Sequence, residues 1–126
     1  MLSVIIPFYN SRKYIKRCIG SLKAQQLLDI EFIFVDDGST DGGYDECISL
    51  FNNDSRFLIV RKENGGTMSA WLEGLNHIKG NYLGFVDVDD YIEPSMFAKM
   101  YEKAVDYDPD DFAKLAEDVM GEFETE

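Results

Sequence analysis

Three carboxylates follow directly after a short apolar run at residues 82–86, in the sequence Tyr-Leu-Gly-Phe-Val-Asp-Val-Asp-Asp. Asp87 and Asp89 are two residues apart, so in an extended chain their side chains point to the same side, and Asp90 stands beside them. Carboxylate oxygens gathered in this way suit Mg²⁺ or Mn²⁺, which commonly also takes phosphate oxygens from a substrate. The pattern indicates a metal site, and a polar loop that caps the next helix is the plainer alternative.

Two further apolar runs end in turns that carry polar side chains. Residues 2–6 lead into Pro-Phe-Tyr-Asn at residues 7–10, and residues 31–35 lead into Asp-Asp-Gly-Ser at residues 36–39. Continuous apolar runs of this length are typical of strands that are buried on both faces, as in a parallel sheet. Because ligands bind outside the carboxyl ends of parallel strands, we expect the three polar turns to surround one site.

Helical patterns separate these runs and a further apolar run at residues 57–60. Ser11 can cap a helix with apolar residues at three- and four-residue spacing, and residues 39–41 can cap another. Residues 67–78 form a third helical pattern, and Pro94 opens a fourth. This alternation predicts a three-layer α/β fold with a mostly parallel central sheet and helices on both faces.

The composition limits the class of protein. A chain of 126 residues is large enough for one domain with its own core, and a formal charge of −12 argues against nucleic-acid binding, which needs a basic face. The chain has no long apolar stretch and no basic leader before an apolar segment, so we expect no membrane span and no signal peptide. Cys18 and Cys47 fall on apolar helix faces and are interpreted as reduced core residues of a cytoplasmic protein.

Four segments of the sequence form longer motifs, and three of them contain the polar turns that follow the apolar runs. They read Ser-Val-Ile-Ile-Pro-Phe-Tyr-Asn at residues 3–10, Val-Asp-Asp-Gly-Ser-Thr-Asp at 35–41, Asn-Gly-Gly at 64–66, and Gly-Asn-Tyr-Leu-Gly-Phe-Val-Asp-Val-Asp-Asp-Tyr at 80–91. In this order they resemble the family 2 glycosyltransferases, which are inverting, nucleotide-sugar-dependent enzymes with a GT-A fold. The resemblance implies part of a nucleotide-sugar-binding domain at residues 1–105, followed by an acidic helical tail at residues 106–126.

The resemblance also implies roles for individual residues. Pro7 and Tyr9 would line the pocket for the nucleotide base, and Asp37, together with Asp36, would hold the base and ribose through carboxylate hydrogen bonds. Asp89 would be the principal metal ligand. Asp87 would hold the ribose or support the metal. The implied donor is a UDP-type nucleotide sugar, bound with Mn²⁺ or Mg²⁺, whose charge offsets the repulsion between a diphosphate and the carboxylates.

Two departures from the family pattern affect these expectations. On the helix after residues 64–66 the family commonly carries an Arg-Asn pair, where this chain has Trp71 and Leu72, and we interpret Trp71 as a packing residue. The family also continues into an acceptor-binding half with a carboxylate base, and no later aspartate stands at a strand end here, so no catalytic residue is assigned. We therefore expect the donor portion of a larger enzyme or a truncated relative, with an exposed apolar surface prone to self-association.

Other functions are alternatives to a transferase. A degenerate, non-catalytic nucleotide-binding or interaction module is favoured by the missing acceptor half and by the departure at Trp71. A signalling receiver domain needs an acidic pair after its first strand, and a nucleotide-sugar pyrophosphorylase needs a glycine-rich loop there, whereas residues 7–13 supply neither. Asp36 and Asp37 can also form a simple helix-capping turn with Gly38 in a left-handed conformation. For a transferase, analogy suggests a glycan or lipid-linked acceptor and contact with the inner face of the membrane.

Overall fold

The structure is a computed structural model and describes residues 1–106 of the chain. Strands and helices alternate throughout this range, as the sequence predicts. The strands are β1 (Leu2–Phe8), β2 (Ile30–Asp36), β3 (Phe57–Arg61) and β4 (Tyr82–Phe85), and the helices are α1 (Arg12–Lys23), α2 (Gly43–Phe51), α3 (Thr67–Leu75) and α4 (Met96–Asp106).

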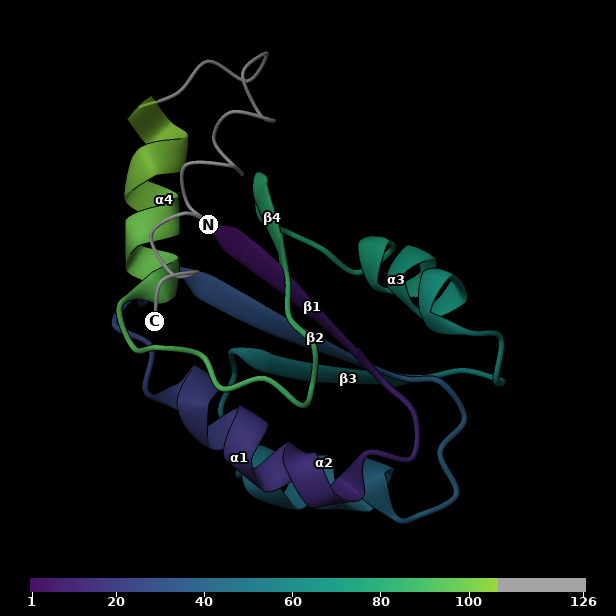
Figure 1. The fold of residues 1–126 in the computed structure, drawn as a ribbon. Helices are drawn as coiled ribbons and strands as arrows, with labels where there is room; N and C mark the ends of the chain where they lie inside the picture. Colours follow the sequence, from purple (N-terminus) through teal and green to yellow (C-terminus); the bar gives the residue numbers. More distant parts are fainter. Residues whose placement is uncertain (107–126) are drawn as a thin grey trace.

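The strands of this range form one parallel sheet in the order β3-β2-β1-β4 (Figure 1). β1 pairs with β2 from Leu2 opposite Ile30 to Phe8 opposite Asp36, and β4 pairs with the other side of β1. The chain moves outward from β1 through β2 to β3 and then returns to place β4 beside β1. The direction of strand addition therefore reverses between β1 and β4.

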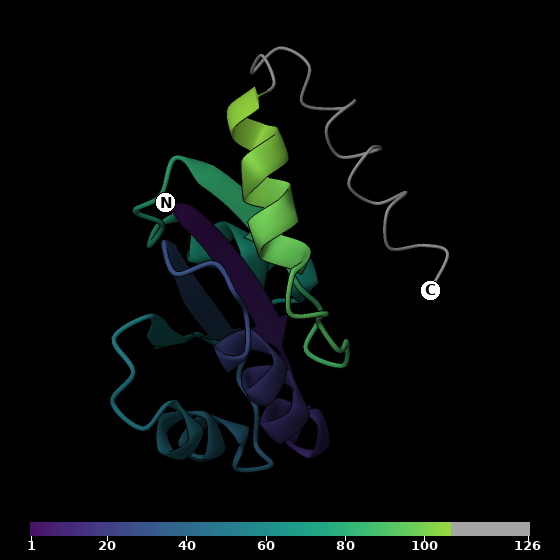
Figure 2. The same ribbon diagram turned by 90° about the vertical axis from the view of Figure 1, so that its left-hand side faces the viewer.

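The sheet is the middle layer between helices on both faces, which confirms the predicted three-layer α/β class. Val4 and Ile6 of β1 face α1, α2 and α4, in a core that also contains Phe97 of α4. Ile5, which lies between them in the strand, faces the other way and packs in a second core with Ala70 of α3. Figure 1 shows α3 across the sheet from α1 and α2, and Figure 2 shows α4 beside the start of β1.

The edge strands β3 and β4 are not buried on both faces, so the expectation from their apolar sequences is wrong. Leu58 of β3 is 43% exposed and Phe85 of β4 is 46% exposed, whereas Val4 and Ile33 of the inner strands are fully buried. An edge strand has a single strand neighbour, and part of its surface stays open. An apolar run therefore predicted each strand but did not predict its position in the sheet.

The loops that follow β1 and β2 are joined by reciprocal hydrogen bonds. The backbone N–H of Asn10 donates to Ser39 Oγ at 2.9 Å, and the backbone N–H of Thr40 donates to Asn10 Oδ1 at 2.8 Å. Asn10 has a φ of 47°, a left-handed conformation that asparagine tolerates better than most residues. These contacts fix two of the three polar turns relative to each other.

Asp41 caps both helices that leave these loops. Its Oδ2 accepts a hydrogen bond from Arg12 N at 3.0 Å and its Oδ1 accepts one from Gly43 N at 2.9 Å, at the first turns of α1 and α2. The side chain of Ser11, the expected cap of α1, instead donates to Tyr9 O at 2.9 Å. One carboxylate thus satisfies two helix N-termini, which secures the position of both helices against the sheet.

The remaining expectations concern the tail, the membrane and the cysteines. The acidic helical tail lies outside the described residues, apart from its first residue. Among residues 1–106, the helices are too short or too polar to cross a bilayer. The thiols of Cys18 and Cys47 are free and buried, as expected for core residues.

Candidate functional site

A pocket lies at the carboxyl end of β1, where the direction of strand addition reverses. Parallel sheets commonly bind ligands at such a point. The lining residues come from the ends of β1, β2 and β4 and from the starts of α1 and α3: Pro7, Phe8, Tyr9, Ser11, Tyr14, Asp37, Thr67, Ala70, Asp87, Val88 and Asp89. The three polar turns therefore surround one site, as the sequence predicts.

The pocket contains most of the residues expected to bind nucleotide or metal, namely Pro7, Tyr9, Asp37, Asp87 and Asp89. Tyr9 is 49% exposed, so its ring is accessible to a ligand. An aromatic ring and a proline beside several carboxylates combine an apolar surface with hydrogen-bond acceptors. A nucleotide presents the matching groups, which are a flat base, polar ring and ribose groups, and phosphates.

Asp37 is held by three donors from the loop that leads into α3. Its Oδ1 accepts hydrogen bonds from Lys62 Nζ and Gly65 N, and its Oδ2 accepts one from Gly66 N, each at 2.9 Å. Burial acts to raise the pKa of Asp37, but the hydrogen bonds from Lys62 and the two glycine amides outweigh it, and the pKa lies below its ordinary value of 3.8. The carboxylate is therefore ionised at neutral pH and fixed in the pocket wall.

Asp36 does not line the pocket, although it was also expected to hold the nucleotide. Its side chain is fully buried, and its Oδ1 accepts a hydrogen bond from Ser39 N at 2.8 Å. Its Oδ2 lies 3.9 Å from Arg61 Nε. Gly38, which lies between Asp37 and Ser39, has a φ of 85°, the left-handed conformation that the helix-capping alternative requires. The position of Asp36 favours a structural role in the turn over contact with a nucleotide.

The acidic cluster, defined as Asp87, Asp89 and Asp90, follows β4 at the other side of the pocket. Each residue offers a carboxylate oxygen, and these oxygens lie within 4.8 Å of one another at exposed positions. Asp90 N donates to Asp87 O at 3.0 Å, which closes the turn that gathers the three side chains. Burial, followed by the charges of Asp87 and Asp89, raises the pKa of Asp90. A set of hard oxygen donors under mutual repulsion fits a divalent cation.

Gln25 anchors the segment that follows the acidic cluster. Its side chain is buried, and its Nε2 donates to Glu93 O at 2.9 Å and to Ile92 O at 3.3 Å. Its Oε1 accepts a hydrogen bond from Phe97 N at 3.3 Å, at the start of α4. The side-chain amide of Gln25 thus attaches the segment between the acidic cluster and α4 to the end of α1 near both ends of that segment.

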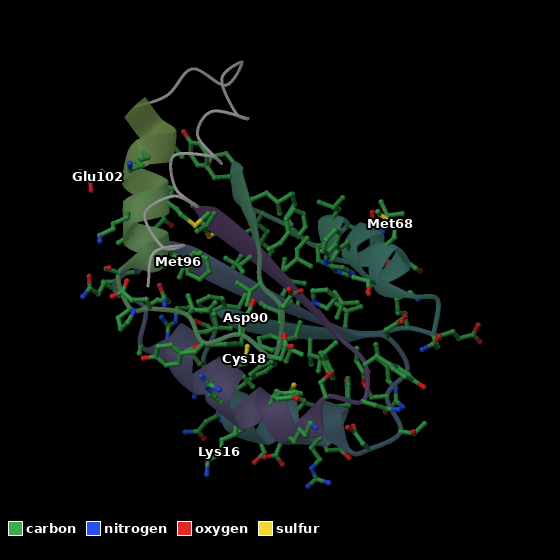
Figure 3. All side chains as sticks on the ribbon, viewed as in Figure 1. Lys16, Cys18, Met68, Asp90, Met96 and Glu102 are labelled. Atoms are coloured by element: carbon green, nitrogen blue, oxygen red, sulfur yellow. The ribbon has the colours of Figure 1, made fainter. Side chains whose placement is uncertain are left out.

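Helix α1 lies close to the acidic cluster. Burial, followed by the charges of Asp90 and Asp89, raises the pKa of Cys18 to about 12. Figure 3 shows Asp90 close to the part of α1 that carries Cys18. The neighbouring Arg17 has its guanidinium carbon 5.6 Å from the centre of the Tyr91 ring. Cys18 thus lies within electrostatic range of the acidic cluster, and Arg17 contacts Tyr91, the residue that follows the cluster.

Trp71 and Leu72, which replace the Arg-Asn pair, do not line the pocket. Trp71 packs against the core on the α3 face, with its ring centre 4.9 Å from that of Phe85. Leu72 is 57% exposed and shares the outer surface of α3 with Met68, which points away from the sheet in Figure 3. This contact supports the interpretation of Trp71 as a packing residue.

Six lining residues were given no role from the sequence: Phe8 and Val88, which lie within the predicted polar turns, and Ser11, Tyr14, Thr67 and Ala70, which lie outside them. Tyr14 fits the apolar face of α1 by its spacing, yet it is 37% exposed and reaches the pocket from the first turn of the helix. The first turn of a helix that follows a strand lies beside the end of that strand. Position after a strand end, rather than residue type, is the signal that identifies such residues.

Comparison with known proteins reveals sequence relatives. The family model of Glycosyl transferase family 2 matches residues 3–115. Glycosyltransferase GlyA of Streptococcus pneumoniae serotype 4 is 39% identical over 109 residues, which are 86% of this chain and 16% of that protein. The uncharacterized glycosyltransferase EpsJ of Bacillus subtilis is 39% identical over 104 residues, which are 82% of this chain and 30% of that protein. The chain spans less than a third of the length of either relative.

The fold is also similar to that of solved structures. Residues 1–349 of Staphylococcus aureus TarS, in complex with UDP-GlcNAc, match with a TM-score of 0.76 and 30% sequence identity. The match covers 83% of this chain and 31% of that chain. A protein with the same fold therefore holds a sugar nucleotide in a solved structure.

Proposed function

The chain belongs to glycosyl transferase family 2, and on that premise we propose that its pocket binds the nucleotide of a UDP-type sugar donor. The proposed reaction is inverting transfer of the sugar to a glycan or lipid-linked acceptor. The observation that carries the proposal is the pocket at the end of β1, which combines Tyr9, Asp37 and Asp89 from three different strand ends.

The nucleoside is assigned to the side of the pocket formed by β1 and β2. Pro7 and Tyr9 offer a flat apolar surface for the base, and Asp37 offers an ionised acceptor for N–H or O–H groups of the base or ribose. Asp36 receives no role in binding, because its side chain is fully buried and bonded within its own turn.

The diphosphate is assigned to the side of the pocket formed by β4. Asp89 is the principal ligand for Mn²⁺ or Mg²⁺, Asp87 is the second, and Asp90 completes the set of carboxylate oxygens that lie within 4.8 Å of one another. A divalent cation held there would supply the positive charge that neutralises a departing diphosphate. The exposed position of the cluster leaves room for phosphate oxygens and water in the coordination shell.

The similarity to TarS supports the donor class. That structure contains UDP-GlcNAc and shares 30% sequence identity with this chain. The sequence relatives GlyA and EpsJ are glycosyltransferases, which supports transfer as the reaction class. Inverting stereochemistry, Mn²⁺ or Mg²⁺ as the metal, and a glycan or lipid-linked acceptor belong to the proposal.

The proposal assigns residues 1–105 to the nucleotide-sugar-binding part of the enzyme and assigns no catalytic base within residues 1–106. By analogy with family members that act on lipid-linked acceptors, we propose that the enzyme works in the cytoplasm at the inner face of a membrane. Exposed apolar side chains gather on α3 and on the open edge of the sheet at β4: Met68, Leu72, Leu75 and Phe85. They support contact with further protein, including self-association.

Donor turnover tests the proposal. The protein is incubated with Mn²⁺ and with UDP-GlcNAc, UDP-glucose or GDP-mannose, and release of the nucleoside diphosphate is measured with and without oligosaccharide acceptors. We expect binding and release with a UDP-sugar, and loss of both in the Asp89→Asn variant. Failure to bind any nucleoside diphosphate in the presence of metal would refute the proposal.

A non-catalytic nucleotide-binding module is the second candidate. The observation that favours it is Trp71, which packs against the core at the position where the family commonly carries an arginine. Metal-dependent UDP binding without donor turnover is the result expected of this candidate, and also of a donor portion whose catalytic base lies outside residues 1–106. Turnover with inversion at the anomeric carbon would exclude it.

A further inference from the structure

Lys62 is the cation that faces Asp37. Its ammonium lies 2.9 Å from Asp37 Oδ1, and the side chains of Lys62 and Asp37 are 17% and 6% exposed, respectively. Lys62 Nζ also donates to Glu63 O, in the backbone of its own loop. Lys62 does not line the pocket, whereas Asp37 does. The contacts of Lys62 are thus with the carboxylate and with its own loop rather than with the pocket interior.

The hydrogen bonds to Asp37 leave one position open for a ligand. A carboxylate accepts about four hydrogen bonds, two at each oxygen. Lys62 Nζ and Gly65 N fill both positions at Oδ1, and Gly66 N fills one at Oδ2. The second position at Oδ2 is the acceptor that Asp37 can present to the pocket.

We propose that Lys62 is a positioning residue for nucleotide binding, which fixes Asp37 as an ionised carboxylate with one open acceptor for a single N–H or O–H donor of the nucleoside. The inference rests on the proposed nucleotide function of this pocket. It narrows the ligand group at Asp37 to a hydrogen-bond donor, because an anion or an acceptor atom would be repelled by the negative oxygen.

The surrounding charges make Lys62 necessary. Asp36, which precedes Asp37 in the chain, is a buried carboxylate. The cation near it is Arg61, whose Nε lies 3.9 Å from Asp36 Oδ2. Asp87 and Asp89 add two further carboxylates to the same pocket. Without Lys62, a nearly buried Asp37 would keep only two amide donors among several anions, and its ionised form would be disfavoured.

Gly65 provides the space that this contact needs. A Cβ atom at Gly65 would lie 2.9 Å from Lys62 Nζ and 2.8 Å from Ser69 Oγ. A side chain there would displace the Lys62 ammonium or the Ser69 side chain. The glycine within the Asn-Gly-Gly segment thus permits the Lys62 ammonium and the Gly65 amide to reach the same carboxylate oxygen.

Calorimetric titration with UDP in the presence of Mn²⁺ tests the proposal. The variants are Lys62→Met, Lys62→Gln and Lys62→Arg, with Lys16→Met as the matched control, because Lys16 is an exposed lysine that points away from α1 in Figure 3. We expect Lys62→Met to weaken UDP binding about tenfold, since hydrogen bonds between charged groups are the strong ones. Lys62→Arg should restore most of the affinity, Lys62→Gln should be intermediate, and Lys16→Met should have no effect.

A double-mutant cycle separates positioning from a general structural effect. In an Asp37→Asn background, Lys62→Met should cause little further loss of UDP affinity, because its effect passes through the carboxylate. The affinity for Mn²⁺ alone should be unchanged in Lys62→Met, since the acidic cluster lies on the other side of the pocket. Lys62→Gln retains a donor and serves as the test if Lys62→Met does not fold.

Three results would overturn the inference. Wild-type UDP affinity in both Lys62→Met and Lys62→Gln would remove the role of Lys62. An equal loss in the Asp37→Asn background would show that Lys62 acts independently of Asp37. Absence of UDP binding by the wild-type protein would overturn this inference together with the proposed function, whereas the first two results leave the proposed function intact.

Discussion

Asp37 and Asp89 line the same pocket although the strands that precede them, β2 and β4, are not neighbours in the sheet. β1 lies between these strands, and its carboxyl end contributes Pro7 and Phe8 to the lining of the pocket. The two carboxylates also differ in their surroundings. Asp37 is nearly buried and holds three donors, whereas Asp89 is exposed within a cluster of like charges. We therefore expect the two residues to respond differently to mutation.

Asp89→Asn should remove most metal-dependent UDP binding and leave the fold intact. The exposed carboxylate can be replaced by an amide at little cost to stability, but the amide loses the charge that a divalent cation requires. We expect UDP affinity in Mn²⁺ to fall by about tenfold or more, the range seen for changes around metal ligands. Asp45→Asn on the exposed surface of α2 removes the same charge and should bind UDP like the wild type. Calorimetry and circular dichroism on both variants provide the measurement.

Asp37→Asn should weaken nucleotide binding and also destabilise the fold in a pH-dependent way. The folded pKa of Asp37 is lowered below 3.8, so its carboxylate contributes stability above pH 3.8 that is lost as the pH falls through the folded pKa. The variant should therefore be less stable than the wild type at pH 7 by about 1–3 kcal/mol, and the difference should shrink in acid. Urea unfolding from pH 7 to pH 3 measures this difference. A gap that stays constant over the series would contradict the assigned pKa direction.

Gly74→Ala should destabilise the protein although alanine favours helices. A Cβ atom at Gly74 of α3 would lie 2.7 Å from Ile5 Cγ2 of β1, so α3 would have to move away from the sheet. Overpacking of this kind costs about 1–3 kcal/mol. Gly20→Ala in α1 is the matched control: its Cβ would meet nothing within 4 Å, and it should stabilise by about 0.4–1 kcal/mol. Opposite signs of the two changes in thermal unfolding are the expected result.

Gln25→Ala should loosen the segment between the acidic cluster and α4. The change leaves Phe97 N and the carbonyl of Glu93 without their side-chain partner in a buried region, at a cost of about 1–3 kcal/mol. We also expect severalfold weaker Mn²⁺ binding, measured by paramagnetic resonance of the free ion. The adjacent Gln26 has an exposed side chain and bonds Pro94 O through its backbone, so Gln26→Ala should match the wild type. Equal effects of the two alanines would argue against the anchoring role.

The sequence was sufficient to predict the fold class and the edge of the sheet that carries the site. Apolar runs end in polar turns after β1, β2 and β4, and parallel pairing is enough to bring these turns together. The same runs did not reveal that Leu58 and Phe85 are exposed, because burial depends on which strands lie at the edges. Strand order is a property of the assembled sheet rather than of any one segment.

The partners of the site residues were not predictable from local pattern. Lys62 and Asp37 are 25 residues apart, and Gln25 and Phe97 are 72 residues apart, so their contacts depend on how the loops meet after folding. Residue type alone gave Asp36 and Asp37 the same expected role. In the folded chain Asp36 accepts a hydrogen bond from Ser39 N, whereas Asp37 lies in the pocket wall.

Metal dependence of UDP binding by the wild-type protein tests the central claim most directly. Calorimetric titrations are performed with UDP in Mn²⁺, with UDP in EDTA, and with uridine in Mn²⁺. We predict clear binding of UDP in Mn²⁺ and weak binding of uridine. In EDTA, UDP should bind at least about tenfold more weakly, because its diphosphate must approach Asp87 and Asp89 without a cation to neutralise the charges. Equal UDP affinity with and without the metal would contradict the assignment of the acidic cluster to the diphosphate.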